Sequence, residues 1–438
     1  MALLARLALI LSFAATAATP ASAQDRIVRF LSTQFAPLNE AAALRHHALD
    51  SFDGLSQFQP YDSLAVIERL TEGDNAPVDL VAGVHGDMEA LAQAGLLRPI
   101  PAITGFDPDR GIPDAIAEAA RLGTDQQMYI PWMQGTYLMA ADRRALAYLP
   151  VGADLERLTY DQFRVWAAAV NTANGHPMVG FPAGPRGLMP RFIQGFLYPS
   201  FTGAAITTLR SPDVGPMWEY MRQLWRNVNI RSLTYNQMHE PLLSGDVWIA
   251  WDHVARLLPA IRAEPDRFVV FPSPIGPYGR GALIVIIGLA IPTGTHDVAP
   301  SPGDWRTMVP RANRLIGHLT APDIEAGMIS ALGVFPIAED SRLWPVDPSL
   351  ISVADAVGIQ ASDVDTILGV LPPRLGGGTR ALTMNYMLLF TQIVLRDADI
   401  YATSRAVAEQ INSVLDQDPH PCWLPDPVTD DPCRVPLR

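Results

Sequence analysis

The sequence predicts an α/β protein with mainly parallel sheets, and three observations support this class. Short apolar runs alternate with helical stretches at the spacing of βαβ units. The chain of 438 residues is 49% hydrophobic and only 18% charged, which supplies enough apolar side chains for buried cores. Its 39 prolines and 32 glycines follow no repeat period, so a solenoid or propeller is not expected. The length favours roughly two to three domains.

The N-terminal segment is typical of a secretory signal peptide. Arg6 supplies a positive charge, residues 7–18 are apolar, and Ala21-Ser22-Ala23 forms a small-residue cleavage pattern. The apolar run is shorter than the roughly 20 residues that span a bilayer. We therefore expect residues 1–23 to be removed after Ala23. Because no cysteine lies near this point, we expect a periplasmic protein that is not a lipoprotein.

The next segments alternate between strand and helix. The first strand covers 27–31 and is followed by a helix over 39–50, an extended piece at 58–61, a helix over 63–72 and a strand at 78–83. In sheets of this type, ligands bind outside the carboxyl ends of the strands. The loops after the first and third strands, which contain Gln34 and His85 to Asp87, are therefore predicted to face a ligand.

A second alternating region follows. Its segments are an extended stretch at 129–142, a helix capped by Thr159, a strand at 178–181, a helix over 214–227 and a strand at 247–251. Asp252 is predicted to cap the helix after that last strand. The apolar segment 282–291 is too short to span a membrane and is predicted to be a buried strand.

Composition excludes several classes of function. All 32 basic residues are arginines, so lysine Schiff-base chemistry, pyridoxal phosphate attachment and a P-loop lysine are absent. The formal charge is −13 and no long basic run occurs, which argues against nucleic-acid binding. The chain contains no H-E-x-x-H or G-x-S-x-G sequence, and the glycines at 376–378 belong to no dinucleotide-binding pattern.

Several segments occur in an order typical of one family. They are IPWMQGTYLM at 130–139, EPLLSGDVWIAW at 240–251, FPSPIGPYGR at 271–280 with GLAIP at 288–292, and GVFP at 333–336. In this order they resemble the crossing strands and turns of family 1 extracellular solute-binding proteins, the maltose-binding-protein-like receptors of carbohydrate ABC importers. Asp142-Arg143 departs from the Asn-Lys pair that is common in relatives, at a position that we interpret as structural.

The resemblance implies a two-lobed type II periplasmic-binding-protein fold. Lobe 1 would comprise 24–134 plus 286–342, and lobe 2 would comprise 135–285 plus 343–438. Two or three crossing strands would form a hinge that closes around a ligand. The implied function is capture of a sugar or sugar-like polyol and its delivery to a membrane permease, without catalysis, cofactor or bound metal. We expect a monomer. Two alternatives stay open: a secreted carbohydrate-active enzyme and a ligand-sensing partner of a membrane receptor.

A sugar site needs aromatic platforms together with side chains that bond to hydroxyl groups. The candidates lie on the crossing strands or at strand ends: Gln34, His85, Asp87, Trp132, Gln134, Tyr137, Trp251 and Asp252. Each also has a structural interpretation. A tryptophan on a strand is often part of the core, Asp252 can be only a helix cap, and His85 and Asp87 can be ordinary turn residues.

Arginines raise a separate question about ligand charge. Arg186 and Arg191 flank Pro190, which is suited to the first turn of a helix, and Arg280 stands in a Gly-Arg-Gly sequence. If two such arginines face the cleft, the ligand carries a carboxylate, sulfonate or phosphate. The alternative is that they form surface or interlobe ion pairs.

The only two cysteines, Cys422 and Cys433, lie in a Pro/Asp-rich C-terminal tail. In an oxidising compartment an even number of cysteines and a short loop predict a disulfide. We expect it to staple the tail. A metal site is not expected, because no C-x-x-C spacing occurs.

Overall fold

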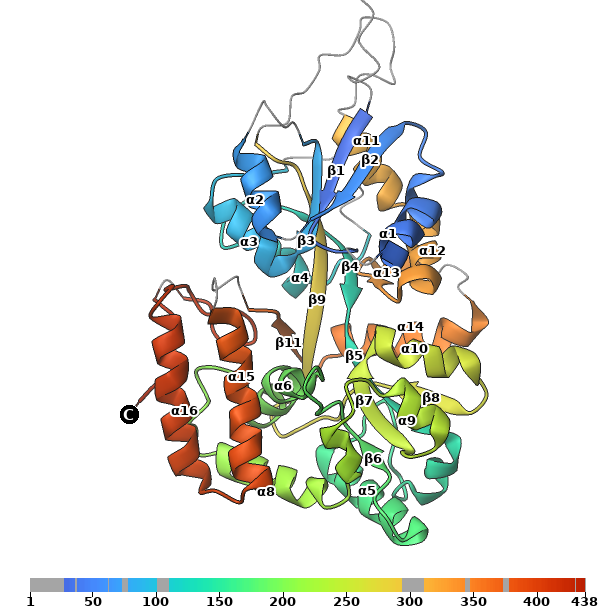
Figure 1. The fold of residues 1–438 in the computed structure, drawn as a ribbon, viewed down its shortest axis with the longest axis vertical. Helices are drawn as coiled ribbons and strands as arrows, with labels where there is room; N and C mark the ends of the chain where they lie inside the picture. Colours follow the sequence, from blue (N-terminus) through green and yellow to red (C-terminus); the bar gives the residue numbers. More distant parts are fainter. Residues whose placement is uncertain are drawn as a thin grey trace, which may run out of the picture.

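The computed structural model describes residues 27–35, 38–61, 63–72, 78–100, 110–293, 311–342, 347–372, 378–429 and 431–437 (Figure 1). The expected signal peptide and its cleavage point lie outside the described residues. Two groups of strands and helices are stacked along the long axis of the molecule. We call the group that contains β1 lobe 1 and the group that contains β5 lobe 2.

The larger sheet has seven strands, most of them in lobe 1, and extends toward lobe 2 through β11 and the first half of β9. Its order is β10-β4-β9-β3-β1-β2, and the seventh strand, β11, pairs with β9. The strands are β1 (Ile27–Ser32), β2 (Leu55–Pro60), β3 (Leu80–Val84), β4 (Ile130–Gly135), β9 (Arg280–Ala290), β10 (Phe335–Pro336) and β11 (Thr366–Val370). β1 is parallel to β2 and β3, whereas β9 runs antiparallel to β3 and β4.

Helices cover this sheet. They are α1 (Leu38–Leu44) with a π-helical turn at Arg45–Leu49, α2 (Ser63–Thr71), α3 (His85–Gln93), α4 (Asp114–Ala119), α11 (Arg311–Leu319), α12 (Pro322–Leu332) and α13 (Glu339–Arg342). One core joins the inner faces of β1, β3, β4 and β9 to α1, α11 and α12. The helix predicted at 39–50 is found at 38–49, where it consists of the α-helix α1 followed by a π-helical turn.

Lobe 2 contains a four-stranded sheet with the order β6-β7-β5-β8. The strands are β5 (Tyr137–Asp142), β6 (Val179–Gly180), β7 (Ile249–His253) and β8 (Phe268–Phe271). The helices around it are α5 (Tyr160–Asn174), α6 (Met189–Phe192), α7 (Tyr198–Thr202), α8 (Val214–Trp225), α9 (His239–Ser244), α10 (Val254–Ala263) and α14 (Ile351–Ser362). Helices α15 (Gly378–Phe390) and α16 (Ile400–Leu415) lie side by side on the flank of this lobe (Figure 1).

Two strand crossings join the lobes. The chain leaves lobe 1 at the end of β4 and enters β5 after the single residue Thr136. The long strand β9 pairs through its first half with β11 and through its second half with β3 and β4, so it runs from one lobe into the other (Figure 1). These crossings confirm the two-lobed α/β fold that the sequence predicts.

Helix caps show where sequence and structure agree locally. Thr159 caps α5 as predicted, and the capping box is completed by Gln162. The prediction that Asp252 caps the following helix is wrong. Strand β7 continues to His253, and the His253 ring nitrogen accepts the hydrogen bond from the N–H of Ala255. The strand is thus shifted toward the C-terminus relative to the predicted range 247–251.

The C-terminal tail is fastened to lobe 2. Cys422 and Cys433 form the predicted disulfide. Within the loop that it closes, the buried Asp426 carboxylate accepts hydrogen bonds from the backbone N–H groups of Ala205, Ile206 and Thr207. Among the described helices, none combines the length and apolarity that crossing a bilayer requires.

Candidate functional site

The carboxyl ends of the parallel strands in the two lobes point toward each other. β1, β3 and β4 run in the same direction, and β4 continues directly into lobe 2. In lobe 2, β6 and β7 run in the opposite direction to β5, so that the last residue of β7, His253, pairs with the first residue of β5, Tyr137. The loops after β1 and β3 therefore face the loops after β6 and β7, which defines the candidate site.

On the lobe 1 side, the loops after β1 and β3 are tied together. The Thr33 hydroxyl donates a 2.7 Å hydrogen bond to the Asp87 carboxylate. The Gln34 side-chain amide donates to the Thr33 carbonyl at 2.9 Å. A Cβ atom at Gly83 would lie 2.9 Å from the Thr33 hydroxyl, so glycine allows the two loops to approach. The predicted residues Gln34 and Asp87 thus lie at one strand-end surface.

His85, the first residue of α3, is buried against Tyr129. Its Nδ1 atom lies 2.9 Å from the Tyr129 hydroxyl, within hydrogen-bonding distance. Burial lowers the pKa of His85 to about 4 and raises the pKa of Tyr129. The imidazole is therefore neutral at physiological pH and anchors the start of α3.

The predicted aromatic residues lie in the cores. Trp132 is fully buried in lobe 1, where its indole N–H donates to the Leu319 carbonyl at 2.8 Å and its ring meets Phe35 edge-on. Tyr137 and Trp251 are also buried and stack on each other in lobe 2. In this conformation the three rings pack against protein, which corresponds to the structural interpretation of strand aromatics.

Gln134 is fully buried near the end of β4. Its amide nitrogen donates to the carbonyl of Pro336 in β10 at 3.2 Å. Its side-chain oxygen has no hydrogen-bond partner among the described residues. The residue connects β4 to β10 just before the chain crosses between the lobes.

Asp252 and His253 occupy the end of β7 beside the crossing. The Asp252 carboxylate accepts hydrogen bonds from the N–H groups of Met238 at 2.9 Å and His253 at 2.7 Å. Burial raises the pKa of Asp252 to about 7, and it lowers the pKa of His253 to about 4. A Cβ atom at Gly135 would lie only 2.7 Å from the His253 ring, so this glycine is required where the chain crosses.

A pocket of about 510 Å³ lies at the carboxyl ends of β6 and β7. Arg186, a predicted site residue, lines it. The other lining residues were not predicted: Thr234, Tyr235, Asn236, Gln237, Glu240 and Arg256. They come from the segment before α9 and from the first turns of α9 and α10. The unpredicted segment 234–237 lies before α9 and β7, and no sequence motif marks it as part of a site.

Arg280, at the start of β9, forms its polar contacts with residues of lobe 2. Its fully buried guanidinium lies 3.3 Å from the Asp363 carboxylate and donates to the Glu156 carbonyl. Burial lowers the pKa of Arg280. This arrangement corresponds to the ion-pair alternative for the arginines.

Asp142, where the sequence departs from the common Asn-Lys pair, has a structural role. Its buried carboxylate accepts hydrogen bonds from Arg144 at 2.6 Å and from Arg267 at 2.7 Å. Burial alone would raise the pKa of Asp142, but these two guanidiniums lower it to about 2. The cluster fixes the end of β5 away from the strand ends that face lobe 1.

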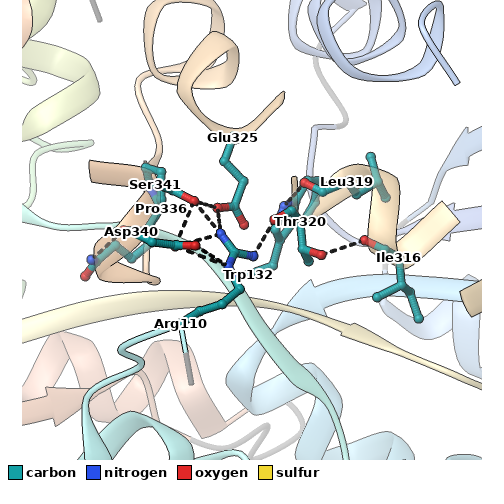
Figure 2. Close-up of polar contacts among 10 residues, drawn as sticks. Arg110, Trp132, Ile316, Leu319, Thr320, Glu325, Pro336, Asp340 and Ser341 are labelled. Carbon is teal, nitrogen blue, oxygen red and sulfur yellow. Dashed lines mark hydrogen bonds and ion pairs between the residues drawn. The ribbon is translucent and has the colours of Figure 1, made fainter. Parts of the chain in front are cut away.

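Lobe 1 also contains an ion cluster, centred on the buried Arg110, that was not predicted from the sequence (Figure 2). The Arg110 guanidinium bonds to the carboxylates of Glu325 and Asp340 at 2.9 Å and donates to the Thr320 carbonyl and the Ser341 hydroxyl. Burial raises the pKa of Glu325 to about 7 despite these partners. The cluster joins α12 and α13 beside the carbonyl that receives Trp132, and it fixes the segment that follows β10.

Among the described residues, no group of three His, Cys, Asp or Glu side chains has the arrangement of a metal site. The site instead offers guanidinium, amide, hydroxyl and carboxylate groups, which form hydrogen bonds with a polar organic ligand.

Comparison with known proteins agrees with this architecture. The chain matches no curated protein in sequence. Solved structures share its fold at low identity. The sugar-binding protein MalE from the phytopathogen Xanthomonas citri has 14% identity and a TM-score of 0.69, with 89% of this chain and 98% of that chain covered.

Two further structures show the same fold. Maltose-bound MalE3 of T. maritima has 14% identity and a TM-score of 0.63, and the match covers 89% of this chain and all (100%) of that one. UgpB from Mycobacterium tuberculosis, in complex with glycerophosphocholine, has 19% identity, a TM-score of 0.61 and coverage of 89% and 98%. Residues 57–302, more than half of the sequence, match one family profile. The chain belongs to the bacterial extracellular solute-binding protein family.

Proposed function

We propose that the protein is a periplasmic receptor that captures a sugar or sugar-like polyol between its lobes and delivers it to the permease of an ABC importer. It acts as a monomer, without catalysis or a cofactor, and its lobes have the boundaries that the sequence predicts. One observation carries this proposal: polar strand-end loops from both lobes face each other across the crossings at Gly135 and within β9.

The site chemistry supports binding of a hydroxylated ligand. The lobe 1 side presents the Gln34 and Asp87 side chains, and the lobe 2 pocket presents Gln237 and Glu240. Carboxylates accept hydrogen bonds from hydroxyl groups, and side-chain amides both accept and donate them. Family membership and the sugar-binding structures of the same fold support the assignment to carbohydrate uptake.

Binding and catalysis are separated by one experiment. Purified protein is incubated with a panel of mono- and oligosaccharides, thermal unfolding is recorded, and the solutions are analysed for products by chromatography. A receptor is stabilised by RT ln(1 + [L]/Kd), about 2.7 kcal/mol at a hundredfold excess over Kd, and leaves the sugar intact. Sustained product formation at substoichiometric protein would instead identify the secreted carbohydrate-active enzyme and overturn the proposal.

A further inference from the structure

The pocket of lobe 2 is lined by two arginines, Arg186 and Arg256. No salt bridge within 4 Å is found for either among the described residues, although Arg256 lowers the pKa of the nearby buried Asp252 against the larger opposing effect of burial. Many other arginines of this lobe are neutralised, as Arg144 and Arg267 are by Asp142 and Arg231 is by Asp246. Arg186 is exposed at the pocket, and Arg256 uses one N–H group on the Asn236 carbonyl, so the remaining N–H groups of both guanidiniums can bind a ligand.

The backbone beneath these arginines is held in place by Asn236. Its side-chain oxygen accepts a 2.8 Å hydrogen bond from the N–H of Arg186, and its carbonyl accepts a 2.7 Å bond from the Arg256 guanidinium. A Cβ atom at Gly184 would lie 2.8 Å from the Asn236 side chain, so glycine allows the two segments to meet. The pocket is thus fixed before a ligand binds, which reduces the entropy lost on binding.

The same segment is anchored at both ends. Gly184 donates its N–H to the Tyr235 carbonyl at 2.7 Å, and Met238 donates its N–H to the Asp252 carboxylate. Asp252 lies at the end of β7, and Arg256 follows in the first turn of α10. Figure 1 shows α10 on the part of lobe 2 that is nearest lobe 1, with α9 farther from it. Because the end of β7 pairs with the start of β5 at the crossing, the Arg256 side of the pocket belongs to the candidate ligand site.

We infer that the ligand carries an anionic group, a carboxylate or a phosphate ester, which Arg186 and Arg256 bind in the lobe 2 pocket. This inference rests on the proposed function and specifies its substrate class. A guanidinium offers a planar fork of donors that matches the oxygens of a carboxylate or phosphate. Glu240, which lines the same pocket, would repel an anionic group. Its carboxylate instead accepts hydrogen bonds from the hydroxyl groups of the sugar or polyol.

The burial of the predicted aromatic residues agrees with this ligand class. Trp132, Tyr137 and Trp251 are each packed in protein, so charged and amide groups dominate the described pocket. The other arginines considered from the sequence have protein partners: Arg280 bonds to Asp363 and the Glu156 carbonyl, and Arg191 donates to the Gln194 side-chain oxygen. The anionic group is therefore bound by Arg186 and Arg256.

The test uses pairs of neutral and anionic carbohydrates. Binding to the full mature protein is measured by calorimetry for glucose, glucuronate and glucose 6-phosphate, and for maltose and maltose 1-phosphate. The same measurements are made on Arg186→Gln and on Arg226→Gln, an exposed arginine at the end of α8 that does not line the pocket. Thermal unfolding without ligand verifies that each variant is folded.

We expect at least one anionic member to bind more tightly than its neutral counterpart, and the preference to decrease with added salt. Arg186→Gln should weaken that binding by about 10- to 100-fold, the effect of losing a charge-assisted contact, whereas Arg226→Gln should leave it unchanged. Equal affinity for the neutral and anionic members, unaffected by Arg186→Gln, would overturn the inference while leaving the proposed function intact. Binding of no carbohydrate of either kind would overturn both.

Discussion

Tyr137 and Trp251 stack face to face at the point where the chain enters lobe 2. Their ring centroids are 5.0 Å apart and the ring planes differ by 5°. His253 meets the Tyr137 ring edge-on at 5.0 Å, and Phe192 and Phe196 contact Trp251. The stack joins the first residue of β5 to the middle of β7 and so links these two strands beside the crossing.

Removing the Trp251 ring from this stack should therefore destabilise the folded protein. We expect Trp251→Ala to lower the free energy of unfolding by about 3–5 kcal/mol, as for other large aromatic side chains deleted from cores. Urea denaturation measures this change. Trp248→Ala is the matched control, because Trp248 is only partly buried and lies under the Arg144 guanidinium. Similar losses for both variants would show that the stack contributes nothing special.

Mutation of the Arg110 cluster should also lower the stability of the protein. Arg110→Met would leave the buried Glu325 carboxylate without its cation and would also remove the pair with the more exposed Asp340, at an expected cost of about 3–5 kcal/mol in the free energy of unfolding. Arg121→Met removes a surface pair with Glu118 and should cost less than about 1 kcal/mol. If chemical denaturation gave equally small effects, the cluster would not hold α12 and α13 together.

The raised pKa of Asp252 should make the stability of the protein depend on pH. Its pKa in the folded protein is about 7, above the ordinary value of 3.8, so the folded state binds its proton more tightly than the unfolded state does. The resulting stability is complete at low pH and is lost as pH rises through about 7. The stability of wild type relative to Asp252→Asn should therefore decrease between about pH 4 and pH 7 and be constant above that. Thermal unfolding across this range tests it, and a constant difference would contradict it.

The disulfide should control how firmly the tail holds its neighbouring loop. Replacing Cys422 and Cys433 by serine removes a cross-link over a separation of 11 residues and should cost about 3 kcal/mol by loop-closure entropy. Because Asp426 lies within that loop, amide hydrogen exchange should accelerate at Ala205, Ile206 and Thr207. Unchanged exchange at these three amides would show that Asp426 is held independently of the disulfide.

Local patterns were sufficient to predict much of the fold. Thr159 has the spacing of a capping box, the segment after Ala282 has the apolarity of a buried strand, and the two cysteines leave only one intramolecular pairing. The strand-end loops with Gln34 and His85 follow from the rule that ligands bind at carboxyl ends. These features depend on residues that are close in sequence.

The rest depends on contacts between distant segments. Whether Trp132 or Trp251 faces a ligand depends on which side of its strand the helices cover. The Trp132 indole N–H, for example, donates to the carbonyl of Leu319, which is 187 residues away in the sequence. Arg110 meets Glu325 across 215 residues. The pocket arginines, Arg186 and Arg256, are brought together by Asn236, which no local pattern indicates.

The most direct test of the central claim is a crystal structure with the carbohydrate that stabilises the protein most. We expect one ligand between the lobes, in contact with both the loops around Gln34 and Asp87 and the pocket around Arg186 and Gln237. A ligand bound elsewhere, or in contact with one lobe only in a closed structure, would contradict the account.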